Sequence, residues 1–351
     1  MNTTPRQRVM AVLRGEMPEK IPFTVYSTKL PSCTVERELR NRGICPVYRT
    51  LSFDIKYPNV KVSSYSYTDD NSRKLVKTIF QTPVGELSTL HEPAGFTSWS
   101  HEHMFKTPDD YKALLFMIKD AVITPAYERA AKLQNDLGED YLVRDALLSE
   151  PLQSLMSNNY MKTEDFCIEW MDNRDELLKL FDAFVANARQ IYPIVANGPL
   201  EFCNYGGNVM PNIIGKNLFE EYYIPFYNEA AEVLHKKGKL IGTHLDGDNT
   251  IIMDLVGKTN LDYIEAYDPG MSPSVAEARK AWPDKVLWIN WPSAWHLHPI
   301  EDVYKETIQL IKEAAPGNKF LIGITEDVPE ERWRGNFTAI MNAIDDYTED
   351  K

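Results

Sequence analysis

The stretch LIGTHLDGD, residues 240–248, begins with a short apolar run and carries four polar side chains, at residues 243, 244, 246 and 248. An apolar run of this length, followed by polar residues, is typical of a buried strand of a parallel sheet. In a barrel of alternating strands and helices, catalytic groups come from the carboxyl ends of the strands. The stretch therefore predicts a barrel strand at residues 240–245 and a functional site around residues 243–248.

Similar apolar runs alternate with amphipathic helical patterns from residue 141 onward, as expected for repeated βαβ units. No G-x-G-x-x-G or G-x-x-x-x-G-K-[ST] loop follows any of them, which favours a closed barrel over an open nucleotide-binding sheet. We predict the α/β class and a single (β/α)8 TIM barrel domain over residues 1–351. The expected strands span residues 21–26, 141–148, 200–205, 240–245, 263–267, 286–291 and 320–325.

Helix signals fall between these strands. Thr4 and Pro5 predict the start of a first helix that ends at Gly15. Ser274 with Glu277 three residues later matches a capping box, and Pro225 is expected to break a helical pattern that surrounds it.

Residues 56–110 follow a different pattern. The stretch VKVSSYSY, residues 60–67, alternates in polarity, and turn residues occur at 69–71 and 83–85. Alternation between turns is typical of antiparallel hairpins. We therefore expect an N-terminal antiparallel β-hairpin insertion over about 56–110, near the barrel mouth.

Composition narrows the range of partners. The chain of 351 residues is 43% hydrophobic and 25% charged, which is ordinary for a globular protein, and its formal net charge is −13. This charge disfavours nucleic acid and anionic membranes as partners, because both require basic surfaces. No apolar run of ~18 residues and no apolar leader is present, so we predict a cytoplasmic protein. Four scattered cysteines indicate neither a disulfide framework nor a zinc module.

Polar residues recur where the expected strands end. One histidine together with several carboxylates suits a divalent cation; without a cation, neighbouring carboxylates would raise one another's pKa. A structural role remains open for this group, with His244 bonded to backbone and the acids capping helices, and Asp248 fits that role well. These strand-end residues are Glu201, Asn204, His244, Asp246, Asp248, Glu265, Asp268, Asn290, Glu326 and Asp327.

Other residues offer alternative sites. His101 and His103 form a possible metal pair in the insertion, and Glu277 with His298 is a rival pair to the strand-end set. His296 and His298 lie on a loop that could reach the mouth. Aromatic residues near the strand ends could either pack internally or form the walls of a site for a flat ligand. The predicted substrate-binding residues are Glu201, Asn204, Tyr205, Tyr267, Asn290 and Trp291.

Several short motifs resemble the uroporphyrinogen decarboxylase superfamily. They are Arg14-Gly15-Glu16, Lys20-Ile21-Pro22, the segment 221–225 and Gly242-Thr243-His244. The resemblance covers most of the chain and implies a barrel. True decarboxylases of this superfamily carry an Arg-Gln-Ala-Gly-Arg signature after the first strand, whereas residues 26–33 here contain no arginine. Porphyrinogen decarboxylation is therefore not expected.

The second well-known branch consists of corrinoid-dependent methyltransferases. Its thiol-specific members bind zinc through a His-x-Cys pair and a further cysteine at the last strand end. The resemblance places Asp246 at the first cysteine and Glu326 near the second, so that oxygen replaces sulfur. It implies zinc held by His244, Glu265 and Glu326, and catalytic roles for His244, Asp246 and Glu326.

This change of ligand suggests a methyl group bound to oxygen. The resemblance then implies an O-demethylase component that transfers methyl from an aromatic ether, such as guaiacol, veratrole or vanillate, to the cobalt(I) of a separate corrinoid protein. No Asp-x-His-x-x-Gly corrinoid motif occurs in the chain, so the cobalt must come from that partner. A decarboxylase of an aromatic or tetrapyrrole acid and a non-catalytic binding subunit remain as alternatives.

Overall fold

The computed structural model describes residues 3–94, 97–157 and 159–349. The chain divides into two compact units. Unit 1 comprises Met1–Ser52, Ala126–Leu148 and Val195–Lys351, and unit 2 comprises Phe53–Pro125 and Ser149–Ile194. No helix within the described residues is long and apolar enough to cross a membrane.

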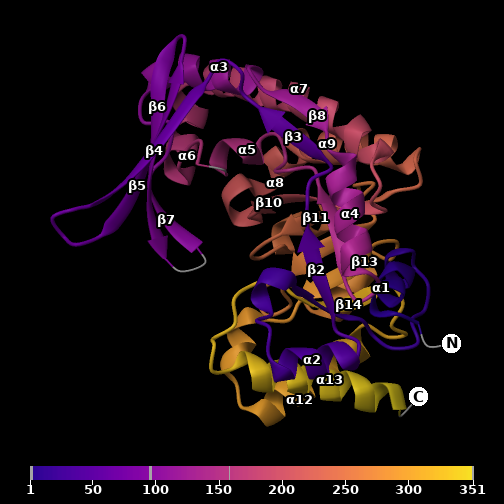
Figure 1. Ribbon diagram of the computed structural model, residues 1–351. Helices are drawn as coiled ribbons and strands as arrows, with labels where there is room; N and C mark the ends of the chain where they lie inside the picture. Colours follow the sequence, from indigo (N-terminus) through magenta and orange to yellow (C-terminus); the bar gives the residue numbers. More distant parts are fainter. Residues whose placement is uncertain (1–2, 95–96, 158, 350–351) are drawn as a thin grey trace. The chain divides into compact units, whose positions relative to one another are not determined.

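Unit 1 is a closed barrel of eight parallel strands, in the order β1-β14-β13-β12-β11-β10-β9-β2 (Figure 1). The predicted (β/α)8 fold is therefore confirmed. Strands β11 and β12 have the predicted bounds, whereas the strand β2 was not expected from the sequence. The strands are β1 Phe23–Tyr26, β2 Cys45–Arg49, β9 Leu142–Ala146, β10 Phe202–Val209, β11 Leu240–Leu245, β12 Tyr263–Tyr267, β13 Val286–Asn290 and β14 Phe320–Ile324.

Two of the predicted helix signals in unit 1 occur where the sequence indicates them. Ser274 caps α11 through a capping box with Glu277, and the pattern around Pro225 is split into α8 and α9. The helices are α1 Pro5–Leu13, α2 Thr34–Asn41, α4 Tyr127–Leu137, α8 Pro211–Tyr222, α9 Ile224–His235, α10 Met253–Val256, α11 Val275–Ala281, α12 Ile300–Glu313 and α13 Trp333–Glu349, with 3-10 turns at Ser27–Lys29, Thr250–Ile252 and Ser293–Leu297.

Helix α1 packs at the amino end of the barrel. Thr4 caps it with Gln7, as the sequence predicts, and its apolar face is buried. Burying these side chains against the strands stabilises the fold by about 1.5–3 kcal/mol each. The interior of the barrel is therefore apolar at this end. The cluster consists of Val9, Met10, Val12, Leu13, Tyr26, Cys45, Val47, Leu142, Phe202, Tyr263, Val286, Trp288 and Leu321.

Gly242 is required where β11 passes the ring of Tyr263. A Cβ atom at this position would lie 2.2 Å from a carbon of that ring. The ring has no free space to move into, because Tyr263 is completely buried and donates a hydrogen bond of 2.6 Å to the carbonyl of Cys203.

Replacing Gly242 by alanine is therefore expected to lower the free energy of unfolding by about 1–3 kcal/mol, the usual range for overpacking a core. Urea titration would measure the change. Gly206→Ala is the matched control, because a Cβ there meets nothing within 4 Å. Equal stability of the two variants would contradict this explanation of Gly242.

Unit 2 contains the antiparallel strands. β3 (Phe53–Lys56) pairs with β8 (Val122–Pro125), and four further strands form a sheet in the order β4-β5-β6-β7, within the interval predicted for the hairpin insertion (Figure 1). Those four are β4 Lys61–Thr68, β5 Lys74–Thr82, β6 Gly85–Ala94 and β7 Thr97–Glu102. The helical segments are Pro108–Asp110, α3 Tyr111–Lys119, α5 Gln153–Met156, α6 Thr163–Asp172 and most of α7 Arg174–Asn197.

Candidate active site at the carboxyl ends of the barrel strands

A layer of polar side chains lies inside the barrel, toward the carboxyl ends of its strands. It contains Tyr26 of β1, Arg144 of β9, Asn204 of β10, His244 of β11 and Glu265 of β12, all of them at most 5% exposed. Polar groups buried this deeply are costly unless they bond one another. These five do so, and they form one network.

Glu265 is at the centre of this network. Its side chain is completely buried, forms a short ion pair with Arg144 and accepts a 2.8 Å hydrogen bond from Asn204 Nδ2. Burial alone would raise the pKa of Glu265. The charge of Arg144 and the neighbouring His244 outweigh that effect and hold the pKa well below its ordinary value. Glu265 is therefore ionised.

The two ring nitrogens of His244 face different groups. Nδ1 lies 3.2 Å from Oε2 of Glu265 and 3.3 Å from the hydroxyl of Tyr26. Since Glu265 is ionised and can only accept, Nδ1 donates to it. Nε2 is buried and makes no hydrogen bond within the described part of the chain, although Oδ1 of Asp246 is 3.1 Å away.

His244, Asp246 and Glu326 form a group of possible metal ligands. One ligand atom from each lies within 4.8 Å of the others. Asp246 follows β11 and is partly buried, while Glu326 follows β14 and is exposed. The donors are one imidazole nitrogen and two carboxylate oxygens, which zinc and related divalent ions accept with a further position left open. The buried Nε2, which faces Oδ1 of Asp246 at 3.1 Å, supports this fit.

The structure replaces one residue of the predicted metal set. Glu265 was expected to bind the metal with His244 and Glu326. It instead faces Nδ1, the nitrogen turned away from Asp246 and Glu326, and its oxygens are occupied by Arg144 and Asn204. The ligand atoms that lie together are thus those of His244, Asp246 and Glu326, and Glu265 lies on the Nδ1 side of the imidazole.

Charges in this group are coupled. Burial lowers the pKa of His244, but Tyr26, Asp246 and Glu265 outweigh it, so that the pKa lies well above its ordinary value. Partial removal from water and the charge of Asp246 raise the pKa of Glu326. A divalent cation would relieve both effects, because it replaces the proton of the imidazole and neutralises the carboxylates.

The aromatic residues expected to stack on a ligand lie on the outer side of the barrel strands. Tyr205 packs against Tyr227 of α9, with ring centroids 5.6 Å apart. Tyr267 packs against Trp282 and donates a 2.5 Å hydrogen bond to the carbonyl of Pro273. Trp291 donates from Nε1 to Thr307 of α12 at 3.0 Å. These three side chains join the barrel to its helices, and we remove them from the substrate-binding set.

The three polar residues predicted to bind substrate lie in different parts of the barrel. Glu201 precedes β10 at the amino end of the barrel, where it pairs with Arg6 and Arg14, so it is also removed from the set. Asn204 belongs to the polar layer through its bond to Glu265. Asn290 lies at the carboxyl end of β13 and accepts from the backbone and hydroxyl of Thr325. Asn204 and Asn290 are therefore both buried and bonded to other groups of the barrel.

The residues of the alternative metal pairs have other partners. Glu277 caps α11 through Ser274, and His298 bonds Glu306 of α12 at 2.7 Å. His101 bonds Glu92 at 2.9 Å in unit 2. Within the described residues, the group of His244, Asp246 and Glu326 is the one that places three potential ligands together. Asp248 accepts from Thr250 at the start of the next 3-10 turn, which fits its expected capping role.

His296 provides a test of pH dependence away from the site. It is 2% exposed, packs on Trp291, and bonds Asn336 through Nδ1 at 3.1 Å. Burial lowers its pKa from 6.5 to about 4. The unfolded chain therefore binds a proton between these values that the folded chain does not, so stability falls as the pH falls through this window.

The shift corresponds to about 3 kcal/mol of stability lost between pH 6.5 and pH 4. Urea unfolding of the native chain and of His296→Gln at several pH values in this window would measure it. The glutamine variant is expected to lose less stability on acidification than the native chain. If the free energies of unfolding of the two proteins fell equally with pH, His296 would not be the residue responsible for the loss of stability.

Two residues of the polar layer were missed in the sequence. Arg144 and Tyr26 belong to predicted strands, but neither follows the end of its apolar run. Their guanidinium and ring are close, with the Arg144 Cζ 5.5 Å from the Tyr26 ring centroid. The sequence did offer a signal for Arg144, which is a charged residue within an otherwise apolar strand. A buried charge must be paired, so this position indicated a buried ion pair.

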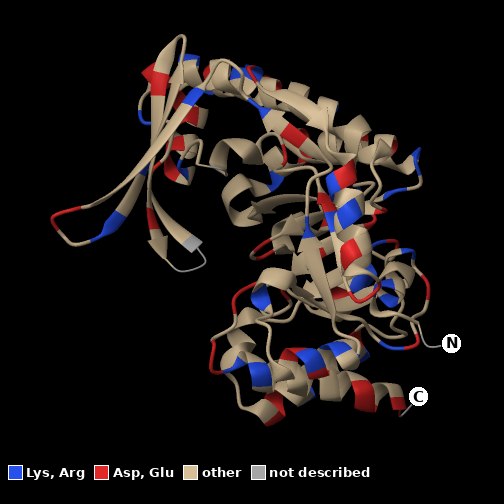
Figure 2. Ribbon diagram, viewed as in Figure 1, with Lys and Arg blue, Asp and Glu red and all other residues tan. Residues whose placement is uncertain are grey.

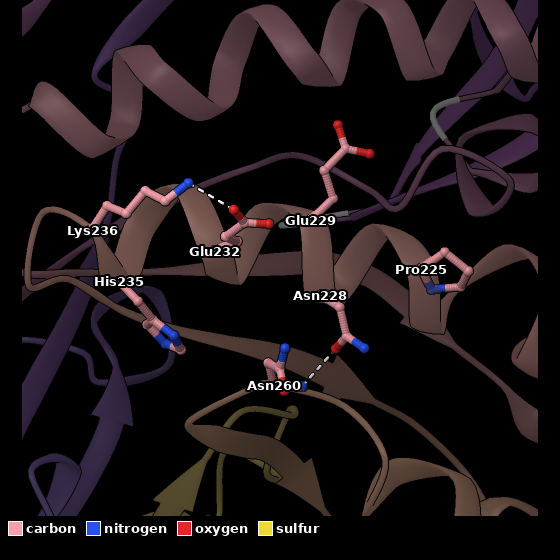
Figure 3. A pocket seen from close by; sticks show the side chains of 7 residues that line it. All are labelled: Pro225, Asn228, Glu229, Glu232, His235, Lys236 and Asn260. Carbon is pink, nitrogen blue, oxygen red and sulfur yellow. Dashed lines mark hydrogen bonds and ion pairs between the residues drawn. The ribbon is translucent and has the colours of Figure 1, made fainter.

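A groove of about 730 Å³ lies on the outer face of α9, near the amino end of β12 (Figure 3). Its polar groups bond one another: Lys236 pairs with Glu232 at 2.7 Å, and Asn228 accepts from the backbone of Asn260 at 2.7 Å. His235 pairs with Asp262 at 2.9 Å. The groove therefore lies away from the polar layer and is not assigned to the site.

No family model and no curated protein sequence matches this chain. Among solved structures, a methyltransferase from Methanosarcina mazei is similar over 98% of this chain and 99% of its own, with a TM-score of 0.59 and 11% identity. A B12-independent methionine synthase from Shewanella sp. W3-18-1 covers 85% of this chain and 77% of its own, at a TM-score of 0.39 and 10% identity. At such low identity, the first likeness shows the fold alone, and the second carries no further argument.

Proposed function

We propose that this protein is a methyltransferase of the uroporphyrinogen decarboxylase superfamily, in its corrinoid-dependent branch. The observation that carries the proposal is the buried Nε2 of His244, which lies 3.1 Å from Oδ1 of Asp246 in a group that Glu326 completes at the carboxyl ends of barrel strands. The similarity in fold to the Methanosarcina methyltransferase extends over nearly the whole chain and supports this assignment.

In this proposal His244, Asp246 and Glu326 hold a zinc ion. When bound, zinc acts as a Lewis acid that stabilises negative charge on the leaving oxygen of a substrate. Glu265 fixes the His244 proton on Nδ1, so that Nε2 presents its lone pair. Arg144 and Asn204 in turn fix Glu265.

We further propose that the methyl donor is an oxygen compound, with aryl methyl ethers such as guaiacol, veratrole and vanillate as the leading class. The methyl carbon passes to cobalt(I) of a separate corrinoid protein, the carbon–oxygen bond breaks, and its electron pair stays on the aryl oxygen, which becomes a phenol on protonation. A site with two carboxylate ligands favours an oxygen donor over a sulfur donor. Tyr205, Tyr267 and Trp291 face the helices and do not stack on a ligand. They are therefore no argument for an aromatic methyl donor.

A decarboxylase remains the less supported alternative. Arg144 is the arginine of the polar layer, and it is paired with Glu265 rather than available to a substrate carboxylate. No arginine occurs in residues 26–33, where decarboxylases carry their signature.

The proposal is tested by supplying the zinc-loaded protein with chemically reduced cobalamin and one methyl donor at a time. We expect methylcobalamin and the matching phenol from at least one aryl methyl ether, and no product from a methylated thiol. Transfer from the thiol alone would reject the oxygen donor, and failure with ethers, amines and thiols alike would reject methyl transfer.

A further inference from the structure

Strand β4 forms one edge of the four-stranded sheet in unit 2. All eight of its residues, Lys61–Thr68, are exposed, so neither face of this strand is covered. Its neighbour on one side is β5, paired over the full length of β4 from Lys61 opposite Gln81 to Thr68 opposite Lys74. Within the described residues, no strand pairs with its other side. Half of the backbone donors and acceptors of β4 therefore face outward.

This edge lacks the features that usually prevent pairing. Natural edge strands are commonly short, charged, bulged or interrupted by proline. The sequence of β4, KVSSYSYT, is long for an edge strand, carries one charge at its start, and contains neither proline nor glycine. The opposite edge strand, β7, is shorter and has an irregular register with β6 between Leu90 and His91.

We infer that β4 pairs with β4 of a second copy of this chain, antiparallel and about a twofold axis at Tyr65. The axis runs perpendicular to the sheet, so each face of one sheet continues into the same face of the other. The two four-stranded sheets then form one eight-stranded sheet. Closed twofold dimers are the commonest symmetric assemblies of soluble proteins.

The sequence of β4 is complementary to itself in this register. Tyr65 lies opposite Tyr65 of the second copy, and Val62 lies opposite Thr68; aromatic and β-branched pairs of this kind stabilise antiparallel sheets. Lys61 lies opposite Asp69 of the second copy, so that opposite charges meet at both ends of the new pairing. Moving the axis to Ser64 would place Lys61 opposite Tyr67 and lose both ion pairs.

Charge elsewhere on the strand does not oppose the contact. Figure 2 shows the strands of this sheet as largely uncharged, with charged residues gathered toward their ends. Asp69 is also bonded to Arg73 of its own turn, at 2.7 Å, which holds its carboxylate at the end of the strand. The dimer therefore brings no like charges directly opposite each other.

Oligomeric state tests this inference. Sedimentation or light scattering across a dilution series should give twice the 40.3 kDa of one chain. Tyr65→Lys places two like charges opposite each other at the axis, so it should yield monomers. Trp99→Lys, at an exposed position of β7, adds the same charge on the other edge and should leave the dimer intact.

Cross-linking tests the register. In a Cys167→Ser background, which removes the exposed cysteine, Tyr65→Cys should form a disulfide-linked dimer under mild oxidation. Val62→Cys should not, because the two copies of residue 62 are separated by six positions, or about 20 Å along the strand. A monomeric native chain, dissociation by Trp99→Lys but not by Tyr65→Lys, or cross-linking at residue 62 but not at residue 65 would each overturn the inference.

Discussion

Replacing His244 by alanine is expected to abolish stoichiometric zinc binding and to lower methyl transfer by about 100-fold or more. His244 supplies the nitrogen ligand of the proposed site, and its buried Nε2 lies 3.1 Å from Oδ1 of Asp246. Without it, two carboxylates remain, one of them exposed, and they hold zinc weakly. Elemental analysis after dialysis and the methyl-transfer assay would measure the two effects.

His298→Ala is the matched control for this prediction. His298 is partly exposed and bonds Glu306 on α12, outside the polar layer. This variant should retain both zinc and activity. If His244→Ala kept one zinc ion per chain with unchanged transfer, the proposed ligand set would be wrong.

Replacing Glu265 by leucine is expected to lower the free energy of unfolding by about 3–5 kcal/mol. The substitution leaves the guanidinium of Arg144, 4% exposed, buried without a counter-charge. It also removes the acceptor of the hydrogen bond from Asn204. The double variant Arg144→Met/Glu265→Leu should recover most of this loss, because apolar side chains can replace a buried ion pair at little cost. Urea unfolding of the native chain, the single variant and the double variant would measure the three free energies of unfolding.

Asp254→Asn is the control for this measurement. The pair of Lys216 and Asp254 is more than half exposed on both sides, and its loss should change stability by less than about 1 kcal/mol.

The proposed role of Glu265 in orienting His244 has a separate test. Glu265→Gln should weaken zinc binding by about 10- to 100-fold while the fold is retained. Unchanged zinc affinity in a folded Glu265→Gln protein would contradict that role.

The strands that the sequence predicts best are those with polar residues directly after an apolar run. β11 and β12 have the predicted bounds for this reason. β2 was missed because Pro46 and Arg49 interrupt its short apolar pattern, although parallel pairing with β1 and β9 makes it part of the barrel. Whether such a segment forms a strand depends on pairing with segments distant in the sequence. A local sequence pattern carries no information about that pairing.

The site was partly predictable for a related physical reason. Strand ends meet at one face of a barrel, so the predicted catalytic group of His244, Asp246 and Glu326 does lie together. The direction of a side chain is harder to predict. Ala266 has a positive φ of 64°, and the register of β12 with β13 shifts between Glu265 and Tyr267. The bulge places Glu265 inside the barrel and Tyr267 against the helices, although two residues this far apart normally share a side.

Barrel closure between β1 and β14 has a consequence for synthesis of the protein on the ribosome. Phe23 pairs with Ile322 and Val25 with Ile324, so the first strand has no partner on one side until residues 320–324 have been translated. During that time β1 and β13 each present an open edge. A chain that stopped before residue 320 would keep both edges open permanently, and we expect such a fragment to bind chaperones or aggregate rather than form a smaller barrel.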